Sequence, residues 1–163
     1  MFMNNFQRLF TAIGNLYDSD SWGYLYVIST TNTRIYPSYK CYNNRADAYN
    51  GLPFSGNNIV LGDSNDAEDI EQYCIQGNEI TFTDTSLRVL FSNNKDSIEV
   101  SYIFTGTPTA NATIKEMALY KPIYVGGNNA GNSMIYREVL DEPIDVVANE
   151  AITLQFTIKL KIT

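Results

Sequence analysis

The chain contains no histidine. Histidine is the usual general base of enzymes and the commonest metal ligand of proteins, so its absence excludes the Ser-His and Cys-His mechanisms and the common zinc sites. A phosphate-binding loop is also missing, because Gly126-Gly127 is followed by neither the Lys nor the Ser or Thr of such a loop. We therefore expect a protein that is not an enzyme and that has no cofactor and no metal.

Cysteine and positive charge are scarce. Cys41 and Cys74 are too far apart in the sequence for a metal-binding pair, and we expect two free thiols. Eleven Lys and Arg stand against eighteen Asp and Glu, which gives a formal net charge of -7. Specific nucleic-acid binding draws on clustered Lys and Arg, and here the basic residues are scattered. We therefore expect no specific nucleic-acid partner.

Long apolar runs are absent. A membrane-spanning helix requires roughly 20 consecutive apolar residues, and no stretch of the chain approaches that length. The first residues, Met1 to Phe6, lack the basic start and the apolar core of a signal peptide. We therefore expect no membrane association and synthesis in a cytoplasm.

A faultless alternation of apolar and polar residues closes the chain. A period of two over this length is typical of a β-strand with one buried face, because a helical apolar stripe recurs every three or four residues. The apolar positions are Ile152, Leu154, Phe156, Ile158, Leu160 and Ile162.

Further β-rich runs precede this strand, at the spacing of an antiparallel sandwich. We expect strands at 22–30, 58–62, 79–84, 87–92, 97–105, 112–120, 133–140 and 144–163, with an interruption near 148–150 and turns at 85–86, 93–96, 106–111 and 126–132. The predicted fold is all-β: one domain over 1–163, an antiparallel two-sheet sandwich that is jelly-roll-like, with an N-terminal amphipathic helix and a short second helix.

The N-terminal helix is expected over residues 2–17, within an arm that spans 1–20. Its apolar residues recur at helical spacing. One interpretation is a helix that caps an open end of the sheet, and the other is an arm that docks onto a neighbouring subunit. The candidate interface residues on this arm are Phe2, Phe6, Leu9, Phe10 and Ile13.

A long loop is expected over residues 31–58, which are rich in Tyr and Asn. Tyr offers a large rigid contact area with a polar tip, so the loop suits a contact surface. A loop that folds down to cover a sheet edge is the alternative. The candidate interface residues here are Tyr36, Tyr39, Tyr42 and Tyr49.

An acidic segment follows the strand at 58–62 and predicts the short second helix, from Asp66 to about Tyr73. Acidic residues at its start complement the helix dipole. The same carboxylates could hold Ca²⁺, but their spacing matches no EF-hand loop. They are Asp63, Asp66, Glu68, Asp69 and Glu71.

Two opposite charges lie in the middle of neighbouring predicted strands. Glu116 and Arg137 would meet across the sheet if those strands pair, and they form a candidate structural ion pair. The alternative is two independent solvated charges.

A recurring order of short motifs runs from residue 58 to the end of the chain. The motifs are Ile59-Val60-Leu61-Gly62-Asp63, Ile70 to Ile75, Thr113-Ile114-Lys115-Glu116-Met117-Ala118-Leu119-Tyr120, Met134-Ile135-Tyr136-Arg137-Glu138-Val139-Leu140, and Pro143 to Glu150 before the alternating strand. This order resembles small structural proteins of tailed bacteriophages. The resemblance covers residues 58 to 163, and the chain departs from it at Ala118 and Asn149, where Gly is usual.

This resemblance implies a non-enzymatic virion component that assembles with itself and with other virion proteins, in the connector or ring-like region of the neck or tail. A capsid decoration or head-fibre protein is the nearest alternative. A carbohydrate-binding module that recognises a host glycan through exposed Tyr and Asn is an alternative from a different class. The N-terminal arm and the Tyr-rich loop lie outside the resemblance and would encode the particular attachment role.

Overall fold

A computed structural model describes residues 27–35, 40–42, 45–47, 57–94, 97–125 and 128–161 of the 163-residue chain. These residues form strands and loops and contain no helix. Accordingly, they contain no helix long and apolar enough to cross a bilayer. The strands are β1 (Val27–Ile28), β2 (Arg34–Ile35), β3 (Lys40–Tyr42), β4 (Arg45–Asp47), β5 (Asn58–Gly62), β6 (Phe82–Asn94), β7 (Ser97–Pro108), β8 (Ala112–Val125), β9 (Asn128–Val146) and β10 (Ile152–Lys161).

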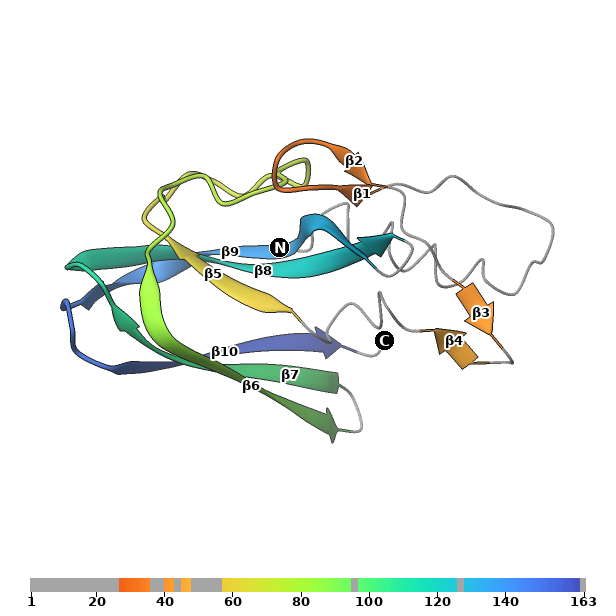
Figure 1. Ribbon diagram of the computed structural model, residues 1–163. Helices are drawn as coiled ribbons and strands as arrows, with labels where there is room; N and C mark the ends of the chain where they lie inside the picture. The colour runs from red at the N-terminus through yellow and green to blue at the C-terminus, as the bar shows by residue number, and fades with distance from the viewer. Residues whose placement is uncertain are drawn as a thin grey trace.

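Two three-stranded antiparallel sheets carry the fold, with strand orders β5-β8-β9 and β10-β7-β6 (Figure 1). The core lies between them, because side chains of both sheets belong to one buried apolar cluster. Leu61, Ile114 and Met117 come from the first sheet, and Tyr102 and Phe156 come from the second. The all-β class with two antiparallel sheets is confirmed.

The alternating strand at the end of the chain is β10, and it pairs with β7 over its whole length, from Ile152 opposite Gly106 to Lys161 opposite Ser97. Phe156 and Ile158 are buried, whereas the polar residues that alternate along the strand, from Thr153 to Lys159, are exposed. The period of two therefore reports the buried face correctly. The predicted interruption before this strand is also present, because β9 ends at Val146 and a turn at 148–149 leads into β10.

An irregularity in the pairing of β8 with β9 decides which side chains of β8 face the core. The register shifts between Ile114 and Glu116: β8 advances two residues there, whereas β9 advances five, from Val139 to Ile144. Ile114 and Met117 both belong to the core between the sheets, although three positions separate them. A regular strand would place them on opposite faces, so the irregularity turns Glu116 onto the outer face.

One predicted turn is wrong. Residues 85–86 do not separate two strands, since β6 continues from Phe82 to Asn94. The sequence signal at this point corresponds to a bulge: Thr83 pairs with Thr107 and Ser86 with Thr105, and Asp84 has a positive φ of 50°. Asp tolerates the left-handed conformation better than most residues, so the strand bends here without ending.

The short second helix is also wrong. Residues 63–79 form an extended loop with isolated turns. Several backbone amides and carbonyls of this loop bond to side chains of the adjacent sheet, which offers an alternative to helical hydrogen bonds.

Within the range 31–58, the structure describes β2, which pairs with the preceding β1, and a hairpin of β3 and β4, and β5 begins at the last residue of the range. The predicted N-terminal helix lies outside the described residues.

Candidate functional site

A buried ion pair lies on the outer face of the β5-β8-β9 sheet. Arg137 Nε donates to Glu116 Oε2 at 2.7 Å, and both side chains are 0% exposed. They are diagonal neighbours, because Arg137 pairs with Ala118 and Glu116 pairs with Val139. The two charges that the sequence suggested as partners therefore meet in the structure, and they are not solvated separately.

The guanidinium of Arg137 also holds one half of the segment 63–79, which we call the acidic loop and which connects β5 to β6 (Figure 1). Nη2 donates to the carbonyl of Asp66 at 3.0 Å, and Nη1 donates to Gln72 Oε1 at 2.9 Å and to the carbonyl of Ala67 at 3.4 Å. The planar fork of Arg suits several acceptors at once. One side chain thus connects the sheet to three points of the loop.

Glu116 holds the other half of the acidic loop. Its Oε1 accepts from the amide of Gly77 at 2.7 Å, and both oxygens accept from the amide of Gln76 at 3.2 Å. Beside it, the Tyr120 hydroxyl accepts from the amide of Ile75 at 2.9 Å. Burial raises the pKa of Tyr120 to about 12.

Glycine makes this close packing possible. A Cβ atom on Gly62 would lie 2.6 Å from Glu116 Oε1, and one on Gly77 would lie 2.5 Å from the amide nitrogen of Ser64. Both contacts are too short for a side chain. The strand end at Gly62 and the loop at Gly77 therefore need glycine because the backbone passes directly over neighbouring atoms.

The acidic residues of the loop take structural roles. Asp63 accepts from the Asn78 amide and side chain at 2.7 and 3.1 Å, which lowers the pKa of Asp63. Glu68 accepts from the amide of Val139 at 3.1 Å, and Asp69 accepts from the amide of Glu71 at 2.9 Å. In the part of the chain that the structure describes, no three acidic or cysteine side chains gather as metal ligands would.

The ion pair and its hydrogen bonds hold the acidic loop against the β5-β8-β9 sheet. A catalytic carboxylate must reach a substrate, whereas Glu116 is fully buried and both of its oxygens accept hydrogen bonds. A small apolar cluster of Val60, Ala118, Tyr120 and Met134 lies alongside, covered by Cys74 and Ile75 of the acidic loop. The β5-β8-β9 sheet is therefore packed on both faces.

The second sheet has one open face. Apart from Ser97, the described side chains on the outer face of β10-β7-β6 are exposed or half-buried. Three of these described side chains are charged: Arg88, and Glu99 paired with Lys159 at 2.8 Å. Hydroxyl groups bond across the strands, as in the 2.9 Å contact of Ser101 with Thr157. The other residues of this outer face are Ser86, Leu90, Ser92, Ile103, Thr105, Thr153 and Gln155.

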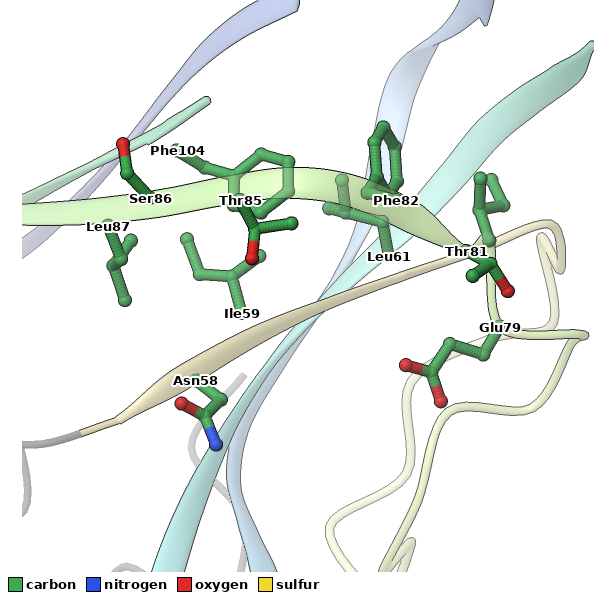
Figure 2. Close-up of a pocket in the computed structure, with 11 residues that line it drawn as sticks. Asn58, Ile59, Leu61, Glu79, Thr81, Phe82, Thr85, Ser86, Leu87 and Phe104 are labelled. Carbon is green, nitrogen blue, oxygen red and sulfur yellow. The ribbon is translucent and has the colours of Figure 1, made fainter. Parts of the chain in front are cut away.

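A cleft of about 440 Å³ opens between β5 and β6. Figure 2 shows Ile59 and Leu61 of β5 lying opposite Thr85 and Leu87 of β6. Phe104 forms part of its wall and packs edge-on against Phe82, with ring centroids 5.2 Å apart. The polar residues of the rim are Asn58, Glu79, Thr81 and Ser86.

Of the interface residues predicted from the sequence, one lies in a described strand and the others do not. Phe2, Phe6, Leu9, Phe10, Ile13, Tyr36, Tyr39 and Tyr49 lie outside the described residues, and Tyr42 lies in β3.

Sequence reasoning missed the cleft and the role of Gln72. The cleft depends on how two strands of different sheets diverge, and no local pattern encodes this. Gly62 next to Asp63 was a usable signal for a close backbone approach.

Comparison of the chain with protein-family models, with curated proteins and with solved structures finds no match.

Proposed function

We propose that this protein is a non-enzymatic structural component of a tailed-bacteriophage virion, which assembles with copies of itself and with other virion proteins in the neck or tail. The resemblance of residues 58–163 to phage structural proteins motivates the class. The observation that supports assembly best is the contrast between the two sheets: the acidic loop covers the outer face of β5-β8-β9, whereas no described segment covers that of β10-β7-β6.

The open outer face has the composition of a contact surface. Leu90 is 40% exposed and lies opposite Ser101, next to Ile103 on the same face. Ser and Thr hydroxyls surround these apolar residues, and Glu99 and Lys159, two of the three charges described on this face, neutralise each other. Protein interfaces combine an apolar centre with a polar rim and few charges, so this face suits a partner better than it suits a small substrate.

The connections between the strands fit a jelly-roll-like sandwich. The chain passes from one sheet to the other between β5 and β6, between β7 and β8, and between β9 and β10. These three crossings lie at one end of the sandwich, and the hairpins β6-β7 and β8-β9 lie at the other. In this proposal, loops at either end are available to meet neighbouring subunits. The N-terminal arm, residues 1–20, would add a docking element in this proposal.

Two measurements test the proposal. Mass spectrometry and cryo-electron microscopy of purified virions should find the protein and place its density in the neck or tail; its absence from the particle would overturn the virion assignment. Native mass spectrometry of the recombinant protein should give a homo-oligomer. Substitution of Leu90 and Ile103 by Lys should reduce it to monomers without loss of the folded state, while Lys at the acidic-loop position Ile70 serves as a matched control.

A further inference from the structure

The cleft between β5 and β6 begins where the two strands meet. The amide of Ile80 donates to the carbonyl of Leu61 at 2.9 Å, and Gly62 and Glu79 form an isolated antiparallel bridge. From this point the chain turns into β6, and the strands diverge (Figure 2). Pairing between β5 and the segment before β6 is therefore limited to one bridge.

The remaining edge of β5 can accept another strand. Leu61 directs its carbonyl to the free side, since it accepts from Ile80 there. Backbone groups repeat every second residue, so the amide and carbonyl of Ile59 point to the same side. Among the described strands, only β8 pairs with β5.

The cleft beside this edge is lined for apolar side chains. Ile59, Leu61, Leu87 and Phe104 line it from both sheets. The bulge in β6 adds Thr85 to the lining, while Ser86 bonds to Thr105 on the outer face of the sheet. An extended segment along β5 would direct alternate side chains into the cleft and the others to solvent.

Charge narrows the choice of occupant. Glu79 is exposed and is the one ionisable side chain among the described residues that line the cleft, and the whole chain carries a formal charge of -7. Glu79 stands at the closed end, beside Gly62. A Lys or Arg at the corresponding end of the bound segment would complement it, whereas an acidic residue would be repelled.

We propose that this cleft binds an extended segment of another virion protein by strand addition to β5. The segment has apolar residues at alternate positions and a basic residue that lies against Glu79. Main-chain hydrogen bonds to Ile59 supply affinity, and the apolar cleft and Glu79 supply specificity. The identity of the partner as a virion protein rests on the proposed function, but strand addition itself does not.

The probe is a fluorescent peptide of about eight residues, a length typical of one strand, in which Val and Thr alternate after a terminal Lys. A peptide of the same composition with the Val residues grouped together is its control. We expect the alternating peptide to bind the full-length protein roughly tenfold more tightly in fluorescence anisotropy. Bound peptide should also slow hydrogen exchange of the Ile59 amide, because strand addition would pair this amide at the free edge of β5.

A second experiment reverses the charge of Glu79. Glu79→Lys should weaken binding of the Lys peptide and strengthen binding of a peptide with Glu in place of Lys, whereas Glu71→Lys on the acidic loop should change neither. Circular dichroism verifies that both variants are folded. Equal binding of the two Val-Thr peptides, an unprotected Ile59 amide, or identical behaviour of the two Lys variants would overturn the proposal. If the peptide binds but the protein is absent from virions, the proposed function fails and the cleft assignment stands.

Discussion

Replacing Arg137 by Met tests the buried ion pair and its hold on the acidic loop. The substitution removes the 2.7 Å bond to Glu116 and the bonds to Asp66, Ala67 and Gln72. Met fills much of the same volume with apolar atoms, so the change isolates charge and hydrogen bonding from packing.

The expected loss follows from the uncompensated charge. Removing one partner of a buried pair costs about 3–5 kcal/mol. Glu116 keeps the amide donors of Gln76 and Gly77, so we expect the lower part of that range, about 3–4 kcal/mol of unfolding free energy. For a chain of this length the melting temperature should fall by about 6–16 °C.

Urea unfolding followed by intrinsic fluorescence measures the change, and a cycle with Glu116→Gln isolates the coupling. The double variant should be more stable than the sum of the single losses implies, because it leaves no buried charge unpaired. Lys159→Met is the matched control: it breaks an ion pair whose side chains are 55% and 27% exposed, and should cost less than about 1 kcal/mol. A loss for Arg137→Met as small as that of the control, or a coupling of zero, would refute the reasoning.

Three further predictions concern single positions. Burial lowers the pKa of Lys121 to about 8 from the ordinary 10.5, so between these pH values the unfolded chain binds more protons than the folded protein, and the stability of the folded protein rises with pH. When the free energy of unfolding is measured from pH 8 to pH 10, the wild type should gain stability relative to Lys121→Met. Parallel curves for the two proteins would contradict this. Gly62→Ala should cost about 1–3 kcal/mol in thermal unfolding, since its Cβ would collide with Glu116, and an unchanged melting temperature would rule out that close approach. Burial, and then the charge of Glu116, raise the pKa of the Cys74 thiol. In a Cys41→Ser background, Cys74 should therefore react with iodoacetamide at pH 8 more slowly than free cysteine does. An equal rate would contradict the packing of the acidic loop over Cys74.

Much of the fold could be predicted because the alternation of apolar and polar residues within a strand indicates which of its faces is buried. The alternation of β10 required no knowledge of its partner, and the turn between β9 and β10 had clear local signals. The failures share one cause. The acids at 66–69 predict a helix start, and Thr85-Ser86 predicts a turn, but hydrogen bonds to distant residues decide both segments.

The site was predictable only in part. Opposite charges at Glu116 and Arg137 stood out because each interrupts an apolar strand, and that conflict between local pattern and charge marks a special position. Their diagonal pairing depends on an irregularity in strand pairing that the sequence does not reveal. The partners Gln72 and Gly77 lie at sequence separations of 65 and 39 from Arg137 and Glu116, respectively, beyond any local pattern.

The way in which the acidic loop is fastened has a consequence for sequence change and for engineering. Its anchors lie on either side of residues 69–71, where Ile70 is 40% exposed. An insertion between fixed anchors adds only loop-closure entropy, about 0.6 kcal/mol for each doubling of length. The tip can therefore accept foreign sequences, such as an epitope or a tag, while the sheet beneath it keeps its cover.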